Sequence, residues 1–328
     1  MTTPRPYSTL AEVNHALVPW GYRALVFEPV RGGVENRCLI VDTSDARAAR
    51  LVLRVHAPGS HDRVALELAA LAQVAAAGLP VPRPLRTTGG EAFAERDGRP
   101  MSLVSHVGGV TLDRAAAAPV PGRDVGALLA RVGATLLALP PAPIRHGIAD
   151  VEAAKDLLAR CRQIAGFPWQ GVAEAVQAAT VVESDWRALP RQIIHGDLSR
   201  TNVVHDGARF AFVDLGGVGA APRVADIAVA IAQLAVVRGR FRADICAGLW
   251  AGWSAVAAPS DAEREAVLPM VRLRYAQLIV EHVWRELDGR RHPRHLPLIA
   301  LGIEGLHALA SLRDGLPGLH RRRLGSAA

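Results

Sequence analysis

Residues 192–217, QIIHGDLSRTNVVHDGARFAFVDLGG, decide the fold of this chain. In this stretch short apolar runs (IIH, NVVH and FAFVD) alternate with polar turns, whereas the sequence from about residue 120 onward otherwise consists of long Ala/Leu-rich segments with helical spacing. The stretch therefore predicts a small strand hairpin embedded in a helical region. It also holds three polar residues in a fixed order: Asp197, Asn202 five positions later, and Asp214 at the end of an apolar strand.

This order of residues suits phosphoryl transfer from a nucleotide. A carboxylate must lie near the acceptor hydroxyl to orient it and take its proton, and oxygen ligands must hold Mg²⁺ against the phosphates. Hard Mg²⁺ prefers Asp and Asn oxygens and takes its remaining ligands from phosphates and water. Taken singly, each of the three residues is more often a turn, cap or strand-end residue. Their joint order, with strands between them, favours the functional interpretation.

The first third of the chain has the texture of mixed strand and helix. Residues 37–43 and 49–56 are β-branched runs separated by a polar turn, which suggests a hairpin, and Asp97-Gly98 suggests the turn of a second one. Between these hairpins, Asp62 is expected to cap a helix that ends at Gly78.

Together these segments predict an α+β fold with two lobes. We expect a β-rich N-lobe at residues 1–104, with an antiparallel sheet and one helix, and a larger, mostly helical C-lobe at residues 105–328. The helices expected in the C-lobe are residues 122–139, 150–165, 171–189, 224–238, 243–256, 261–287 and 296–313.

The composition excludes several classes of protein. The chain has 328 residues, of which 50% are hydrophobic and 21% charged, enough apolar material for one large domain or two smaller ones. No stretch approaches the roughly 18 apolar residues of a membrane span, and no apolar export segment follows a basic start. The cysteines Cys38, Cys161 and Cys246 form neither a disulfide framework nor a zinc pattern. We therefore expect a cytoplasmic protein with no membrane partner.

The formal net charge of +7 comes almost wholly from arginine, because Lys155 is the only lysine. Lys155 lies in AAKDLL with no glycine nearby, which excludes a Walker A phosphate loop. The arginines are spread along the whole chain, and the basic runs at residues 291–295 and 320–323 are short. We therefore expect no nucleic-acid partner.

The motif H-G-D-L-x-x-x-N, followed by a strand that ends in Asp, resembles the aminoglycoside phosphotransferase and choline kinase superfamily, which has a protein-kinase-like fold. Among its subfamilies, GVEN at residues 33–36 and GLPVP at 78–82 look most similar to type II homoserine kinases, and actinomycete antibiotic kinases share the same core. The resemblance covers most of the chain. Its other matching segments are EPVRGGVENRCLIVDT (28–43, the nucleotide-covering hairpin), RLVLRVH (50–56, the third strand), RPMSLVSHVGG (99–109, the hinge) and PRVADIAVAI (222–231, a helix beneath the catalytic loop).

The resemblance implies roles for particular residues. Asp197 is implied to be the catalytic base, Asn202 and Asp214 the Mg²⁺ ligands, and Asp226 a support for the catalytic loop. His195 is expected to pack and hydrogen-bond beneath that loop. The residues implied to bind the nucleotide are Arg54, Glu67, Gly32 and Gly33. Backbone groups of Ser105, His106 and Val107 are implied to hold the base of the nucleotide.

Arg54 departs from the superfamily, which has a phosphate-binding lysine at this position. Arginine keeps the positive charge and offers a bidentate fork, but it is longer and does not substitute neutrally for lysine. This departure leaves open a nucleotide-binding pseudokinase with a regulatory role. The intact set of Asp197, Asn202 and Asp214 favours an ATP- or GTP-dependent kinase that phosphorylates a small-molecule hydroxyl. We expect this kinase to be a monomer or a homodimer.

The sequence leaves several classes of acceptor molecule open. Residues 240–328 carry many more Arg than Asp and Glu, which disfavours a polycationic aminoglycoside and favours an amino alcohol such as homoserine, a sugar, or a natural product such as a nucleoside or macrolide. The role is accordingly metabolic or antibiotic-inactivating. Candidate acceptor contacts, none of which stands out, are Trp250, Trp253, Arg274, Tyr275, Glu281 and Trp284.

Overall fold

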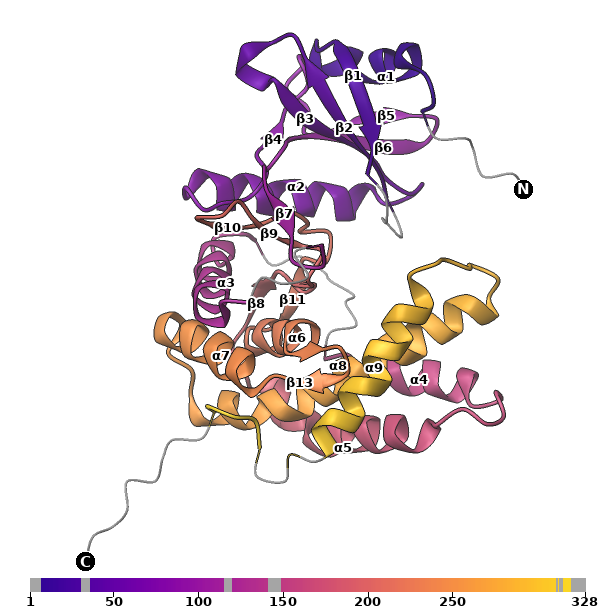
Figure 1. Ribbon diagram of the computed structural model, residues 1–328, viewed down its shortest axis with the longest axis vertical. Helices are drawn as coiled ribbons and strands as arrows, with labels where there is room; N and C mark the ends of the chain where they lie inside the picture. The colour runs from indigo at the N-terminus through magenta and orange to yellow at the C-terminus, as the bar shows by residue number, and fades with distance from the viewer. Residues whose placement is uncertain are drawn as a thin grey trace, which may run out of the picture. The chain divides into compact units, whose positions relative to one another are not determined.

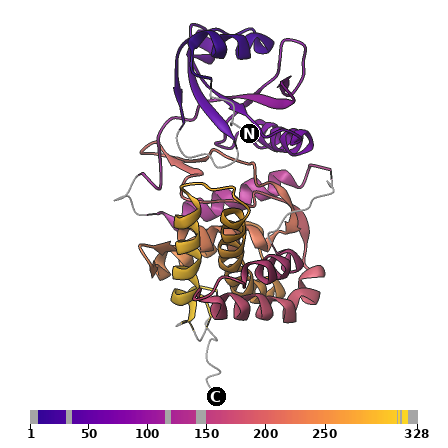
Figure 2. The same cartoon turned by 90° about the vertical axis from the view of Figure 1, so that its right-hand side faces the viewer.

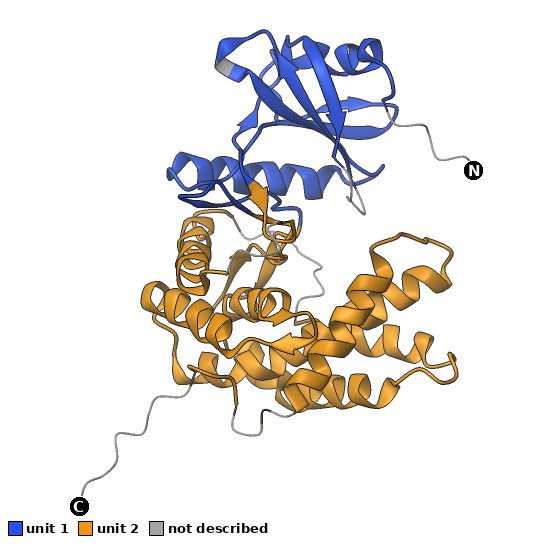
Figure 3. Ribbon diagram, in the orientation of Figure 1, with its two compact units in different colours: residues 1–109, 204–216 blue, residues 110–203, 217–328 orange. Residues whose placement is uncertain are grey.

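The computed structural model describes residues 7–30, 36–114, 120–140, 149–310, 312 and 315–319. The chain forms two compact units, residues 1–109 with 204–216 and residues 110–203 with 217–328 (Figure 3). Residues 204–216 therefore group with the first unit, although they are far along the chain from its other residues.

The first unit is built on a six-stranded antiparallel sheet with the strand order β1-β2-β3-β6-β4, in which β5 also pairs with β6 (Figure 1). Its elements up to residue 109 are α1 (Leu10–Leu17), η1 (Val18–Trp20), β1 (Ala24–Pro29), β2 (Arg37–Thr43), η2 (Ala46–Ala48), β3 (Arg50–Val55), α2 (His61–Ala76), β4 (Pro84–Leu85), β5 (Ala94–Arg96) and β6 (Arg99–Ser105).

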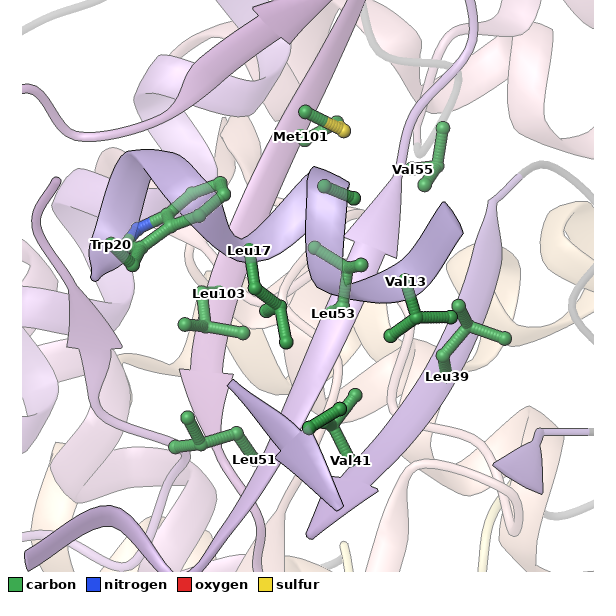
Figure 4. Close-up of a cluster of buried hydrophobic side chains, with 12 residues drawn as sticks. Val13, Leu17, Trp20, Leu39, Val41, Leu51, Leu53, Val55, Met101 and Leu103 are labelled. Carbon is green, nitrogen blue, oxygen red and sulfur yellow. The ribbon is translucent and has the colours of Figure 1, made fainter. Parts of the chain in front are cut away.

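One face of this sheet is covered by α1 and η1, whose apolar side chains point onto the strands (Figure 4). Leu17 and Trp20 pack there against sheet residues such as Leu53, all of them almost fully buried. Side chains alternate between the two faces of a strand. Because Leu53 of β3 faces this core, its neighbour Arg54 points to the opposite face of the sheet.

Both predicted hairpins are confirmed. β2 pairs with β3 in antiparallel register, and β5 and β6 are joined at Asp97 and Gly98, whose φ angles of 52° and 69° are the left-handed values of a two-residue hairpin turn. The expectation that Asp62 caps α2 is wrong, because the helix begins at His61 and Ser60 occupies the cap position. Asp62 lies instead in the first turn, where a negative charge favours the helix dipole.

A short hairpin from the island at residues 192–217 completes the first unit. It consists of β9 (Val203–His205), which lies in this unit from Val204 onward, and β10 (Phe210–Phe212). The amide of Phe212 donates a hydrogen bond of 3.1 Å to the carbonyl of Pro80, in the segment after α2. This bond ties Asp214, two residues further on, to the unit that contains Arg54 and Glu67.

The second unit is mostly helical and is organised around α6 (Val224–Leu234), in which every residue is buried. The long helix α8 packs against both α6 and α9, and α8 and α9 lie side by side in two views (Figures 1 and 2). The other elements are β7 (Val110–Thr111), α3 (Gly122–Leu136), α4 (Val151–Cys161), α5 (Trp169–Arg187), β8 (Arg191–Ile194), β11 (Gly219–Pro222), β12 (Val236–Val237), β13 (Arg240–Phe241), α7 (Ala243–Ala257), α8 (Asp261–Leu287) and α9 (His295–Ala310).

Helices α3 and α7 pack at close range because glycines line their contact. A Cβ atom on Gly126 of α3 or on Gly252 of α7 would collide with the backbone of the other helix. The predicted α+β class, with an antiparallel sheet in the first unit and helices in the second, is confirmed. Within the described ranges, no helix combines the length and apolar character needed to cross a membrane.

Candidate active site

Arg54, Glu67 and Asp214 form a charged network within the first unit. Arg54 Nη1 pairs with Glu67 Oε1 of α2, and Arg54 Nη2 lies 3.2 Å from Asp214 Oδ1. Arg54 and Glu67 are 5% and 2% exposed. Burial disfavours the charge of Arg54, but the two carboxylates outweigh it and raise the pKa of its guanidinium. Arg54 therefore stays a cation that is held in place by its pair with Glu67.

Asp214 is the more accessible member of this network. Its side chain is 44% exposed, and its Oδ1 accepts a hydrogen bond of 2.8 Å from the amide of Gly216. The turn after β10 thus holds one carboxylate oxygen between the Gly216 amide and the Arg54 guanidinium. This leaves Asp214 at the surface of the unit with its orientation set by two donors.

Ser105, His106 and Val107, the residues expected to hold the base of the nucleotide, continue from the end of β6. The Ser105 amide donates to the carbonyl of Arg83 at 2.8 Å, and the His106 amide donates to the carbonyl of Arg50 at 3.1 Å. Two of the three amides are thus engaged within the unit. Gly32 and Gly33, the other expected nucleotide-binding residues, lie outside the residues that the structure describes.

In the second unit, Asp226 fixes the loop that carries Asp197. Its two carboxylate oxygens accept hydrogen bonds from the amides of His195 (3.0 Å) and Gly196 (2.9 Å). Asp226 is almost fully buried, and burial raises its pKa from 3.8 to about 6 although the two amide bonds oppose the shift. This is the support expected at the start of α6.

The loop is also held by its own residues. Asn202 Nδ2 donates to the carbonyl of Asp197 at 2.8 Å, and the Asp197 amide donates to His195 Nδ1 at 3.3 Å. His195 is fully buried, as expected for a structural residue. A Cβ on Gly217 would lie 2.8 Å from Asp197 Cβ, so only glycine allows the chain to pass this close. Asp197 and Asn202 are therefore brought together as one rigid turn.

Arg274 of α8 is the functional candidate that the sequence did not single out. Its Nη2 lies 3.5 Å from Asp197 Oδ1, and its Nη1 lies 3.9 Å from Glu281 Oε2. Arg274 and Glu281 are seven residues apart on one helix, a spacing of two turns that could have indicated a shared face. Of the other candidate contacts, Trp250, Trp253 and Tyr275 are buried in the core, and Trp284 stacks with Arg160.

The donor set suits Mg²⁺ in its chemistry. The side chains of Asn202 and Asp214 each carry an oxygen atom of the hard type that Mg²⁺ prefers, and a Mg²⁺ site with few protein ligands is typical when phosphates supply the rest. In the described part of the chain, no cluster of three or more His, Cys, Asp or Glu could hold a metal ion without such help. These side-chain oxygens are compatible with a Mg²⁺ ion whose remaining ligands come from phosphates and water.

A sheet with a buried Arg–Glu pair and a helical unit with an Asp-anchored H-G-D loop are the parts of a kinase-like small-molecule phosphotransferase. The sequence matches the phosphotransferase enzyme family over residues 26–264. The chain belongs to this family. Membership confirms the predicted superfamily and the expected enzyme class.

The chain is similar to several proteins named homoserine kinase. It is 30% identical to one from Methylobacterium radiotolerans over 251 residues, which are 75% of this chain and 76% of that protein. It is 28% identical to one from Methylobacillus flagellatus over 187 residues, 56% of this chain. The match thus spans only about half, 55%, of the length of the latter protein.

Solved structures show the same fold at low sequence identity. An amicoumacin kinase in complex with AMP-PNP, Ca²⁺ and its ligand has a TM-score of 0.67 at 12% identity, covering 92% of this chain and 94% of that one. A microcompartment-associated aminopropanol kinase has a TM-score of 0.61 at 16% identity, covering 95% and 99%. These similarities confirm the kinase-like fold.

Proposed function

We propose that the protein transfers the γ-phosphate of ATP to the hydroxyl of a small amino alcohol such as homoserine. One observation carries this proposal: the buried Asp226 binds the amides of His195 and Gly196 and so fixes the loop that presents Asp197. A carboxylate acts as a general base only when it is held within hydrogen-bond reach of the proton it takes. A rigid loop with Asp197 at its exposed turn meets that requirement.

Asp197 is proposed as the base. Its side chain is 45% exposed, so an acceptor hydroxyl can reach it, and Asn202 restrains its backbone. Proton removal by Asp197 as the oxygen attacks the γ-phosphorus keeps positive charge from building on that oxygen. The proton passes to the carboxylate, and an electron pair of the hydroxyl oxygen forms the new bond to phosphorus. The bond between the γ-phosphorus and the oxygen that bridges it to the β-phosphate breaks, and ADP leaves with that electron pair.

Arg54 is proposed to hold the α- and β-phosphates. A guanidinium donates in two directions, so Arg54 can keep its pair with Glu67 while it binds a phosphate oxygen. Asn202 and Asp214 are proposed as oxygen ligands of Mg²⁺, which neutralises charge on the phosphates when it is bound. We further expect the backbone of Ser105, His106 and Val107, together with Gly32 and Gly33, to contact the nucleotide.

The names of the relatives favour homoserine over other acceptors, and the relatives give no support to the pseudokinase alternative. A metabolic role is accordingly preferred to antibiotic inactivation, and we place the protein in the cytoplasm. The assay that tests the acceptor, run once with ATP and once with GTP, also determines which nucleotide the protein prefers.

The experiment is a coupled ADP-release assay with purified protein, Mg²⁺ and a panel of acceptors. Homoserine should be phosphorylated, and Asp197→Asn should abolish that turnover while nucleotide binding survives. Phosphorylation of a macrolide or nucleoside in preference to homoserine would reverse the choice of acceptor. Nucleotide binding without turnover of any acceptor would contradict the kinase proposal and favour the pseudokinase.

A further inference from the structure

Arg274 presents a guanidinium that is close to two carboxylates but hydrogen-bonded to neither. Its distances of 3.5 Å to Asp197 and 3.9 Å to Glu281 exceed the 2.7–3.2 Å of a protein hydrogen bond. Its side chain is only 12% exposed, and among the residues that the structure describes its buried Nε has no hydrogen-bond partner. Arg274 therefore keeps donor capacity beside the proposed base.

Another arginine–carboxylate pair in the same unit, in which Glu263 is buried and the Arg223 side chain is 27% exposed, shows the geometry of a completed contact. Arg223 binds Glu263 through two hydrogen bonds, Nε to Oε1 at 2.6 Å and Nη2 to Oε2 at 2.9 Å. Such forked contacts are the normal geometry of an Arg–carboxylate pair, and buried donors are normally bonded. The looser geometry at Arg274 indicates a place for a further anion, which would complete the fork.

Glu281 adds the opposite charge on the same helix. It lies two turns after Arg274 and its side chain is 28% exposed, so it can contact a ligand as well as the guanidinium. A cation and an anion side by side, next to Asp197, match a molecule that carries both charges and a hydroxyl. A polycation would instead meet the positive charge of Arg274.

We infer that Arg274 and Glu281 recognise the two charged groups of an amino-acid acceptor. Arg274 binds the carboxylate through a fork, Glu281 binds the ammonium, and the hydroxyl at the other end of the molecule lies against Asp197. This inference rests on the proposed function and deepens it, because it assigns the acceptor class to two side chains. The same guanidinium could take an anionic oxygen from the transferring phosphoryl group, and the experiment separates these two sources.

The test uses three matched acceptors and the full-length protein. Homoserine has both charged groups, 3-aminopropan-1-ol lacks the carboxylate, and 4-hydroxybutanoate lacks the ammonium. A site built to hydrogen-bond a polar group rejects an analogue without it strongly, so wild-type kcat/KM should favour homoserine over both analogues by about 100-fold or more. Arg274→Met, Glu281→Gln and the control Arg187→Met, at an exposed arginine of α5, are compared on all three.

Arg274→Met should lower kcat/KM for homoserine about 100-fold more than it lowers that for 3-aminopropan-1-ol. Glu281→Gln should selectively lose the preference for homoserine over 4-hydroxybutanoate, and Arg187→Met should change neither ratio. Arg274→Lys, which keeps the charge but not the fork, should recover part of the preference. Thermal unfolding verifies that each variant is folded, and the lysine variant carries the test if the methionine variant is not.

Equal losses for all three acceptors in Arg274→Met would overturn the inference and assign the guanidinium to the phosphoryl group or to Asp197. Turnover of other hydroxyl compounds, with none of the three acceptors phosphorylated, would overturn it while leaving the kinase intact. Absence of any ATP turnover in the wild type would instead contradict the proposed function itself.

Discussion

Arg54 and Arg274 each lie between two carboxylates, yet they differ in how completely those contacts are made. The Arg54 side chain is 6% exposed and pairs with Glu67, which is 3% exposed and lies on a helix packed within the same unit. Arg274 has longer contacts, and Asp197 and Glu281 are 45% and 28% exposed. Arg54 is thus fixed by close contacts inside its unit, whereas the longer contacts of Arg274 leave donor capacity for the inferred acceptor.

The difference has an energetic basis. A buried ion pair that loses one member leaves an uncompensated charge in a medium of low dielectric constant, which is strongly destabilising. Water solvates the carboxylates of an exposed pair after the arginine is lost, so such pairs contribute little to stability. Substitutions should therefore lower the free energy of unfolding more at Arg54 than at Arg274.

The largest effect is expected at the carboxylate that Arg274 contacts. Asp197→Asn keeps the size and the backbone bonds of the residue but cannot take a proton, so kcat should fall by about 10²–10⁴-fold, the usual contribution of general base catalysis. Nucleotide affinity, measured by isothermal titration with an ATP analogue and Mg²⁺, should remain within about threefold of wild type, because the proposed base would contact the acceptor and not the nucleotide. Asp156→Asn, on α4, is a matched surface control. Turnover within tenfold of wild type in Asp197→Asn would remove the base assignment.

The second largest effect is expected at the ion pair between Arg54 and Glu67. Glu67→Ala leaves the Arg54 charge buried with only the partly exposed Asp214 as partner, and should lower the free energy of unfolding by about 3–5 kcal/mol. Arg54→Met combined with Glu67→Leu should recover much of this loss, because it removes both charges together. Urea unfolding followed by circular dichroism measures both variants. A cost below about 1 kcal/mol for Glu67→Ala would show that the pair is dispensable for folding.

Local patterns in the sequence predicted much of this arrangement. Asp97-Gly98 specifies its hairpin turn because both residues tolerate positive φ, and α8 begins and ends at the predicted residues 261 and 287. The order of Asp197, Asn202 and Asp214 identified the loop and the strand that carry them. These features depend on residues close together in the chain, so the sequence contains the information directly.

Contacts between distant residues were harder to predict. No pattern of neighbouring residues in the sequence shows that α1 covers one face of the sheet. None shows either that the Phe212 amide donates to the Pro80 carbonyl, a bond that links the hairpin to the first unit. Arg274 was one of several arginines and aromatic residues on the C-terminal helices, and only packing of α8 brings it to Asp197. Tertiary packing selects one such residue among several with the same local pattern.

A third prediction concerns Asp226, which supports the loop from beneath and is buried like the Arg54–Glu67 pair. Among the described residues, its partners are the amides of His195 and Gly196 and not a cation. Burial raises the pKa of Asp226 from 3.8 to about 6, so the folded state binds its proton more tightly than the unfolded state. Its contribution to stability is then fully present below pH 4 and is lost as the pH rises to about 6, by up to about 3 kcal/mol.

Asp226→Asn removes this titration. The free energy of unfolding of the wild type, minus that of the variant, should fall between pH 4 and pH 6 and be constant above about pH 7. Chemical denaturation at half-unit pH steps measures the difference. A difference independent of pH would show that the Asp226 carboxylate titrates alike in both states, so that its amide bonds fully offset its burial.

The smallest effect is expected at Arg274, where the contrast between the two arginines is tested directly. Arg274→Met keeps an unbranched, largely aliphatic side chain at this position of α8, and it leaves two carboxylates that are 45% and 28% exposed to water. The two lost ion pairs are longer than hydrogen bonds, so the free energy of unfolding should fall by less than about 1 kcal/mol. Arg54→Met, the matched substitution, should cost about 3 kcal/mol or more, because Glu67 would be left charged and buried. The same denaturation experiment compares the two variants at low salt and at 0.5 M NaCl. Added salt screens interactions between exposed charges but has much less effect on buried pairs. Equal losses in the free energy of unfolding for the two methionine variants would mean that Arg274 stabilises the fold as much as Arg54 does. The proposed difference between the two arginines would then be wrong.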